Sequence, residues 1–209
     1  MLKCDVRKFF ASIDHDILLS ILGEYIEDKN TLSLLLKVIN SFYSRQLGVG
    51  LPLGNLTSQL FVNIYLNKFD QFIKHSLKVR CYIRFADDFV ILSEDKRYLG
   101  IILNKIKNYL YDELKLELHP SKVTIETFAS GVDFLGLINF ANYRILRTKT
   151  KRKMLVKIQT RYDDCNKRVI SVESFHQSLQ SYFGLLSHCN GYALEKKLNY
   201  IKNSIYRYE

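Results

Sequence analysis

The sequence predicts an α+β fold in which one mainly antiparallel sheet is followed by a basic helical segment. Segments with strand and helix periodicity follow one another in the order strand, helix, helix, strand hairpin, helix, strand. The chain of 209 residues is 47% hydrophobic and has only two prolines, which is typical of one globular domain, or one domain with a small appendage, without long linkers. Basic residues become frequent near Tyr143, where the composition changes.

The charge and the cysteines restrict the classes of partner and site. The formal net charge of +10 favours a polyanionic partner, with nucleic acid ahead of a membrane. The four cysteines are far apart and form no CxxC pair, which argues against a zinc site and a disulfide scaffold. No stretch is apolar for long enough to span a bilayer, and the N-terminus lacks a signal-peptide pattern. We therefore expect a soluble protein in a reducing, intracellular compartment.

Residues 2–6 form the first predicted strand, and this strand contains an acid. Asp5 stands between Cys4 and Val6. A carboxylate in a buried strand is costly unless it is paired or coordinates a metal. Asp5 is therefore a candidate metal ligand.

Two helices are predicted next. Ser12 or Asp14 is suited to cap a helix through residues 17–25, and a second helical pattern covers residues 32–43. Their apolar stripes are typical of core packing rather than of a binding surface.

A glycine-rich loop at residues 48–59 precedes a predicted long helix at residues 60–77. Glycine lets the backbone approach a ligand closely, and a helix N-terminus suits a phosphate or a base pair. The loop is either a simple entry into the helix or a nucleotide contact, and its position between two acidic strands favours the contact.

The stretch at residues 81–92 predicts a β-hairpin with Asp87 and Asp88 at its tip. Aromatic and β-branched residues flank the two acids on both sides. Adjacent carboxylates repel each other and are costly to desolvate, so a divalent cation is the expected partner. The alternative is a solvated turn, since Asp is common in turns.

Three further elements follow the hairpin. An amphipathic helix carries apolar residues from Leu99 to Leu110, and an extended segment at residues 116–125 turns at Pro120. A second hairpin covers residues 132–140. Lys122 either faces the acids as a phosphate contact or proton donor, or is simply solvated.

The chain has helical periodicity from about residue 149 onward. Between residues 144 and 168 the only acids are Asp163 and Asp164. A basic run is usually a solvated helix face, but here it also suits a surface that follows a phosphate backbone. The cations of this stretch are Arg144, Arg147, Lys149, Lys151, Arg152, Lys153, Lys157, Arg161, Lys167 and Arg168.

Asp5, Asp87 and Asp88 together form an oxygen-ligand site suited to Mg²⁺ or Mn²⁺. Two such ions, bound with substrate phosphates, position an attacking hydroxyl and a leaving pyrophosphate for in-line displacement. That chemistry is nucleotidyl transfer, to which the protein contributes position and electrostatics. The sequence has five histidines, but none accompanies a nucleophile signature.

Five motifs, in this order, resemble those of the reverse transcriptases, which are RNA-directed DNA polymerases. They lie at residues 3–15, 50–59, 82–92, 117–125 and 132–138. The residues that carry the resemblance are Lys3-Cys4-Asp5-Val6-Arg7-Lys8-Phe9-Phe10 with Ser12-Ile13-Asp14-His15, Gly50-Leu51-Pro52-Leu53-Gly54-Asn55-Leu56-Thr57-Ser58-Gln59, Phe85-Ala86-Asp87-Asp88, His119-Pro120-Ser121-Lys122 and Phe134-Leu135-Gly136.

The resemblance implies the architecture of a right-hand polymerase. Residues 1–146 would form the palm, a ferredoxin-like, mainly antiparallel sheet with helices on one face, together with residual fingers elements. Residues 147–209 would form a basic helical thumb that follows a template–primer duplex by its shape.

The resemblance also implies a metal-binding and catalytic set. Asp5, Asp87 and Asp88, with the backbone carbonyl of Val6, would hold two Mg²⁺ ions, with Mn²⁺ as a substitute. Lys122 would act near the triphosphate, while Asp14 matches the motif but suits a helix cap.

A second implied set contacts the incoming nucleotide and the template. Phe10 would lie beneath the sugar and exclude a 2′-hydroxyl, although a core aromatic is the alternative. Gly54, Ser58 and Gln59 would contact the template and the nucleotide. The implied partners are template RNA, a DNA or RNA primer and deoxynucleoside triphosphates, and no membrane.

The second motif narrows the resemblance. Leu53-Gly54 and Ser58-Gln59 stand where most bacterial reverse transcriptases have Gln-Gly and Ser-Pro. This pattern is similar to that of diversity-generating retroelements, whose enzymes copy a template RNA with errors at adenines and work with a small basic accessory protein. Group II intron and retron enzymes share the remaining motifs. The implied location is the cytoplasm of a bacterium, with a bacterial or phage gene.

One departure from the family keeps two alternatives open. The family has a fingers region before the first motif, whereas this chain begins a few residues before Asp5. The first alternative is a catalytically inactive polymerase-derived fragment or nucleic-acid-binding module that lacks fingers. The second is a nucleotidyl transferase that needs no primer or no template. The three intact acids favour catalysis, or a fragment of a catalyst.

Overall fold

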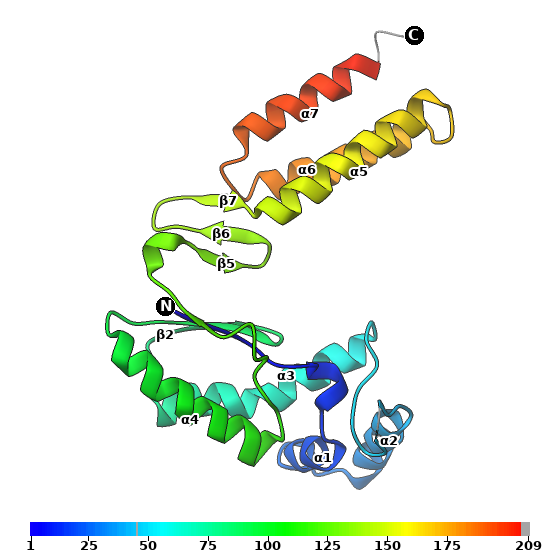
Figure 1. Cartoon of the computed structure of the whole chain (residues 1–209). Coiled ribbons are helices and arrows are strands. Elements are labelled where there is room, and N and C mark those ends of the chain that lie inside the picture. Colours follow the sequence, from blue (N-terminus) through cyan, green and yellow to red (C-terminus); the bar gives the residue numbers. More distant parts are fainter. Residues whose placement is uncertain (45, 206–209) are drawn as a thin grey trace. The chain divides into compact units, whose positions relative to one another are not determined.

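The computed structural model describes residues 1–44 and 46–205 (Figure 1). The chain forms two compact units, Met1–Glu126 and Thr127–Glu209, which we call the first and second units. The resemblance predicts a boundary at residues 146–147, just after the change of composition near Tyr143. The compact units divide earlier because a small sheet precedes those helices, and its residues Leu137 and Leu146 pack into the helical core.

The first unit is built on a four-stranded antiparallel sheet in the order β2-β3-β1-β4. Side chains of a strand alternate between its two faces, so Leu2 and Cys4 of β1 are buried while Lys3 and Asp5 lie partly exposed on the other face. The predicted first strand and acidic hairpin are confirmed. The strands are β1 (Leu2–Asp5), β2 (Cys81–Phe85), β3 (Asp88–Leu92) and β4 (Thr124–Ile125).

The two long helices α3 and α4 lie on one side of this sheet (Figure 1). Phe69 of α3 contacts Phe89 of β3, with ring centroids 5.1 Å apart, and Tyr65 donates a hydrogen bond of 2.7 Å to the Leu114 carbonyl at the end of α4. The helical elements of this unit are η1 (Phe9–Ser12), α1 (His15–Gly23), α2 (Lys29–Asn40), α3 (Leu56–Gln71), the π-helical turn η2 (Phe72–Ser76) and α4 (Lys96–Leu114).

Local chemistry explains where α1 begins. The Asp14 carboxylate accepts hydrogen bonds from the backbone N–H groups of Asp16 and Ile17, at 3.0 and 3.1 Å, and thereby caps the helix. Ser12 does not cap α1, because its hydroxyl donates to the Lys8 carbonyl within η1.

The extended segment at residues 116–125 is only partly a strand. Its last residues, Thr124 and Ile125, pair with Lys3 and Leu2 of β1, and Leu118 forms an isolated bridge with Val6. Pro120 lies between these paired residues and has no N–H to donate to a ladder, so the chain turns there instead of continuing the strand.

The second unit combines a three-stranded antiparallel sheet, in the order β5-β6-β7, with three helices. Phe175 and Leu179 of α6 are fully buried in its core, which is separate from that of the first unit. The elements are η3 (Phe128–Ser130), β5 (Val132–Phe134), β6 (Leu137–Asn139), β7 (Arg144–Leu146), α5 (Thr148–Asn166), α6 (Val172–Leu186) and α7 (Tyr192–Ile205).

The two units together give the mixture of antiparallel sheet and helices that the sequence predicts, so the α+β expectation is confirmed. Within residues 1–44 and 46–205, none of the helices is long and apolar enough to cross a membrane.

Candidate active site

The pairing of β1 with β3 brings the three predicted carboxylates together. Asp5 ends β1, Asp88 begins β3, and the two are register partners in the antiparallel ladder. Asp87 lies in the turn just before β3, where its carbonyl accepts a 3.0 Å hydrogen bond from the Val6 N–H. Ala86 adopts a left-handed conformation with φ of 51°, which closes the tight turn between β2 and β3. Two stretches far apart in sequence thus present their acids at one end of the sheet.

Two lysines neutralise part of this charge. The ammonium group of Lys122 donates to both carboxylate oxygens of Asp5, at 3.0 and 2.9 Å. The ammonium group of Lys3 lies 3.4 Å from Oδ2 of Asp88. Lys122 therefore faces the acids, as one of its two predicted interpretations requires, while the sequence reasoning missed Lys3.

The backbone holds Lys122 in place beside Asp5. The Asp5 carbonyl accepts a 2.7 Å hydrogen bond from the His119 N–H, and the Lys122 N–H donates to the His119 carbonyl at 3.1 Å. The turn at residues 119–122 is consequently tied to the end of β1, so the lysine reaches the acid from an adjacent segment.

Burial and mutual repulsion disfavour ionisation of the hairpin acids. The pKa of Asp87 is raised mainly by loss of water and further by the charge of Asp5, with a partial offset from Lys122. The pKa of Asp88 is also raised mainly by burial; Lys3 lowers it, while Asp5 and Asp87 raise it again. The centre therefore holds negative charge that its lysines compensate only in part.

The carboxylates have the donor chemistry that a hard divalent cation requires. Oδ1 of Asp88 is buried and has no hydrogen-bond partner in the described part of the chain. Such an orphaned anionic oxygen calls for a cation or an ordered water. Among the described residues, no three His, Cys, Asp or Glu side chains are grouped so as to hold a metal ion, and lysines contact Asp5 and Asp88 instead. The ligand assignment of Asp5, Val6, Asp87 and Asp88 stays a prediction.

Phe10 and the glycine-rich loop form a second group of predicted residues. The Phe10 carbonyl accepts a 2.7 Å hydrogen bond from the Leu51 N–H, and the Gly50 N–H donates to the Ile13 carbonyl at the same distance. His15 is buried, and its Nε2 lies 2.7 Å from the Gly50 carbonyl. These contacts fasten the loop to η1, and Phe10 itself is half-buried with its ring edge-on to Phe9, at 5.8 Å between centroids.

Two glycines of this loop are required by its geometry. A β-carbon on Gly50, whose φ is 108°, would lie 2.8 Å from Cβ of Ser44. Gly54 has a φ of 96° just before the cap residue of α3. In the first turn of α3, Ser58 is buried and Gln59 is exposed, so of these two residues Gln59 is the one that presents its side chain to solvent.

A partly buried ion pair between β2 and α3 supports the acidic hairpin. The guanidinium of Arg84 in β2 binds Asp70 of α3 through two hydrogen bonds of 2.8 and 2.6 Å, and Tyr82 donates to the same carboxylate at 2.6 Å. Arg84 also donates to the Ala86 carbonyl in the turn, at 3.1 Å. The sequence reasoning missed this network, although an acid among the apolar residues of a helix was a signal that it needed a partner.

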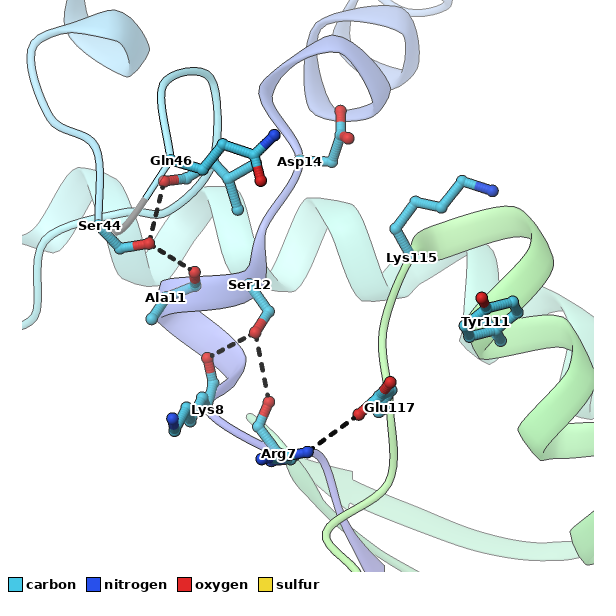
Figure 2. A pocket seen from close by; sticks show the side chains of 11 residues that line it. Arg7, Lys8, Ala11, Ser12, Asp14, Ser44, Gln46, Tyr111, Lys115 and Glu117 are labelled. Carbon is cyan, nitrogen blue, oxygen red and sulfur yellow. Dashed lines mark hydrogen bonds and ion pairs between the residues drawn. The ribbon is translucent and has the colours of Figure 1, made fainter.

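A polar hollow of about 560 Å³ lies between η1 and the end of α4 (Figure 2). Arg7, Lys8, Tyr111, Lys115 and Glu117 are among its lining residues. Arg7 donates to the Glu117 carboxylate at 3.2 Å, and both side chains are about half exposed. Because both cations and carboxylates line the hollow, its charge indicates no single class of ligand.

Comparisons with known proteins agree with the motifs. Residues 1–139 match the model of a protein family described as "Reverse transcriptase (RNA-dependent DNA polymerase)". The chain is similar to protein YkfC of Escherichia coli K12, with 26% identity over 188 residues that cover 72% of this chain and 48% of YkfC. It is similar to the group II intron-encoded protein LtrA of Lactococcus lactis, with 24% identity over a 224-residue alignment that covers 75% of this chain and 37% of LtrA.

A yeast relative and two solved structures extend the comparison. The putative COX1/OXI3 intron 2 protein of Saccharomyces cerevisiae is 24% identical over 198 residues, covering 65% of this chain and 23% of that protein. The chain thus spans about a quarter to a half of the length of these relatives. Two telomerase structures with a fragment of telomeric RNA share the fold, each at 14% identity. The alignment with the Candida tropicalis structure has a TM-score of 0.56 and covers 94% of this chain and 39% of the telomerase chain. The alignment with the Candida albicans structure has a TM-score of 0.53 and covers 85% of this chain and 39% of the telomerase chain.

Proposed function

Since this chain belongs to the reverse transcriptase family, we propose that it carries the catalytic centre of an RNA-directed DNA polymerase, which adds deoxynucleotides to the 3′-hydroxyl of a primer on an RNA template. The observation that carries the proposal is the register of β1 and β3, which sets Asp5 opposite Asp88 and leaves Asp87 in the adjoining turn. Three acids from two segments of the chain at one end of a sheet repel one another, and Lys122 and Lys3 offset that cost only in part, which favours a role in binding a cation.

Asp5, Asp87 and Asp88, with the Val6 carbonyl, are the residues that would hold two Mg²⁺ ions, and Mn²⁺ suits the same oxygens. When bound, such ions lower the pKa of the primer hydroxyl and neutralise the triphosphate. The protein's own part is to keep the carboxylates in position, which the β1–β3 ladder and the ion pair between Arg84 and Asp70 do.

Lys122 is the candidate for handling charge on the leaving phosphates. Its ammonium lies beside Asp5 on an exposed turn, within reach of a group bound at the acids. An ammonium in that position stabilises negative charge or donates a proton to the leaving pyrophosphate.

The loop and η1 are the candidates for holding the nucleotide and template. Phe10 would support the sugar and exclude a 2′-hydroxyl, and Gly54, Ser58 and Gln59 would contact the template and the base pair. Gly54 supports this because its positive φ shapes the approach to α3, and Gln59 supports it because its side chain is exposed. Ser58 is buried, so its contribution would be to position the helix end.

The helices of the second unit would act as a thumb along the template–primer duplex. The lysines of α5 supply positive charge that suits a phosphate backbone, whose neutralisation releases counterions. We extend the proposal to the pairs Leu53-Gly54 and Ser58-Gln59, which favour a diversity-generating retroelement with a small basic accessory protein, acting in the cytoplasm of a bacterium.

Primer extension tests the proposal. The chain is incubated with an RNA template, a labelled primer, deoxynucleoside triphosphates and Mg²⁺, beside the variant Asp87→Ala/Asp88→Ala. We expect template-directed product that falls by at least about a thousandfold in the variant, because the acids position the metal-dependent chemistry. Product without template would indicate a template-independent transferase. Retained duplex binding without any product would indicate a polymerase-derived binding module.

A further inference from the structure

The contact between Lys122 and Asp5 is the strongest ionic contact in the acidic centre. Lys122 donates to both oxygens of the same carboxylate, at 3.0 and 2.9 Å, whereas the ammonium group of Lys3 lies 3.4 Å from Oδ2 of Asp88. Asp5 thus gives both of its oxygens to one ammonium group. A divalent cation that coordinates either oxygen would lie next to this ammonium group, and the two positive charges repel each other.

The two lysines differ in their freedom to move. Lys3 belongs to β1, and its side chain is 21% exposed. Lys122 lies on a turn, before the residues of β4 that pair with β1, and its side chain is 54% exposed while that of Asp5 is only 16% exposed. A long, solvated lysine side chain rotates away at little cost, whereas the acid stays where the strand places it.

The acids also need more positive charge than the lysines give. Oδ1 of Asp88 is buried without a hydrogen-bond partner in the described part of the chain, and Asp88 stands opposite Asp5 in the ladder. A monovalent ammonium at Asp5 therefore leaves the centre undercompensated. A divalent cation supplies twice the charge at the same oxygens.

We propose that Lys122 is the counter-ion of Asp5 in the metal-free protein, that it leaves Asp5 when a divalent cation binds, and that this competition sets the metal affinity of the centre. The inference rests on the proposed function, since it takes Asp5 as a metal ligand. Its consequence is that the ammonium becomes available for substrate phosphates only after the carboxylate is occupied. Lys122 is thus a positioning residue that couples occupancy of the acids to the placement of positive charge.

Mn²⁺ titration followed by electron paramagnetic resonance tests the competition, because free Mn²⁺ gives a signal that bound Mn²⁺ loses. The comparison uses wild type, Lys122→Met, Lys122→Arg, and Lys37→Met as a control that removes one charge on α2. We expect Lys122→Met to bind Mn²⁺ roughly tenfold more tightly than wild type, because the competitor is gone. Lys122→Arg and Lys37→Met should bind within about twofold of wild type, because the first keeps the counter-ion and the second lies elsewhere.

A second measurement on the wild-type chain keeps the test independent of mutant folding. The ¹⁵N signal of the Lys122 ammonium is followed while Mg²⁺ is added, and we expect it to shift as its hydrogen bonds to Asp5 are lost. An unchanged Lys122 signal at Mg²⁺ saturation overturns the inference, as does a Lys122→Met affinity equal to that of wild type.

The same titration separates failure of this inference from failure of the proposed function. If Asp5→Asn loses Mn²⁺ binding while Lys122→Met leaves it unchanged, the metal site stands and only the competition is wrong. If Asp5→Asn and wild type bind Mn²⁺ equally, Asp5 is not a ligand, and both the metal assignment and the competition are overturned.

Discussion

The acidic centre of the first unit and helix α5 of the second unit use charge in different ways. In the first unit, acids and bases meet in pairs at defined distances, as in Lys122 with Asp5 and Arg84 with Asp70. In the second unit, α5 carries six basic residues, and none of its lysines forms an ion pair within the described residues. Paired charge fixes geometry, whereas unpaired surface charge attracts a polyanion without fixing a position. The difference separates a unit suited to chemistry from a unit suited to retention of nucleic acid.

The two separate hydrophobic cores allow the test with the largest expected effect, which is whether the two units unfold independently. Phe69 in the first unit and Phe175 in the second are both fully buried aromatic residues. We expect Phe69→Ala and Phe175→Ala each to cost about 3–5 kcal/mol of unfolding free energy. Hydrogen exchange should show loss of protection only in the unit that carries the substitution. If either variant exposes the amides of both units equally, the units fold as one cooperative body and the division is wrong.

The ion pair beneath the hairpin tests whether paired charge fixes geometry. Asp70→Ala leaves the guanidinium of Arg84 without its carboxylate, and Arg84 is only 10% exposed. We expect a loss of about 2–3 kcal/mol in urea denaturation, because a largely buried charge remains unpaired. Metal affinity should fall as well, since Arg84 holds the turn that bears Asp87. Asp112→Ala on the exposed side of α4 is the control and should change neither quantity.

The lysines of α5 test the other half of the comparison. Replacing four of them by Gln should weaken binding to an RNA–DNA duplex by about tenfold at moderate salt and flatten the salt dependence, because fewer counterions are released. The thermal midpoint should stay unchanged, because these side chains are exposed. The four substitutions are Lys149→Gln, Lys151→Gln, Lys153→Gln and Lys157→Gln.

A matched variant decides whether position or total charge matters. It removes four lysines of the first unit, which lowers the net charge by the same amount. Binding that weakens equally in both variants would mean that the charge of the whole chain, and not α5, attracts the duplex. The control substitutions are Lys29→Gln, Lys37→Gln, Lys78→Gln and Lys96→Gln.

Local patterns were enough to predict the acidic hairpin and the first strand. The alternation in residues 2–6 and the β-rich residues around Asp87 and Asp88 have a period of two, which a single stretch of sequence reveals. The cost of an acid in a buried strand then predicted that Asp5 joins them, and the β1–β3 register does place it opposite Asp88.

What sequence reasoning missed depends on contacts between distant segments. Lys3 stands beside Asp88 only because of that register, and Asp70 meets Arg84 only because α3 crosses beneath β2. Neither pairing leaves a local pattern. Composition likewise marked the start of the basic helices but not the division at residues 126 and 127, because the β5–β7 sheet is not basic and is joined to the helices by packing.

The smallest predicted effect concerns how much stability the fold loses because Asp88 is ionised at neutral pH. The pKa of Asp88 is raised above its ordinary value of 3.8 even with Lys3 beside it, mainly because of burial. An acid whose folded-state pKa is raised favours the fold below its ordinary pKa, and that contribution is lost as the pH rises through the folded-state value.

Asp88→Asn stays neutral, so at pH 7 it should be more stable than wild type, by less than about 1 kcal/mol because solvent still reaches the side chain. Urea denaturation should show this advantage shrinking toward zero below pH 3.8, and an advantage independent of pH would mean that packing, not ionisation, is responsible. If Asp88→Asn is more stable than wild type and also binds Mn²⁺ more weakly, the acid is retained for its chemistry and not for stability.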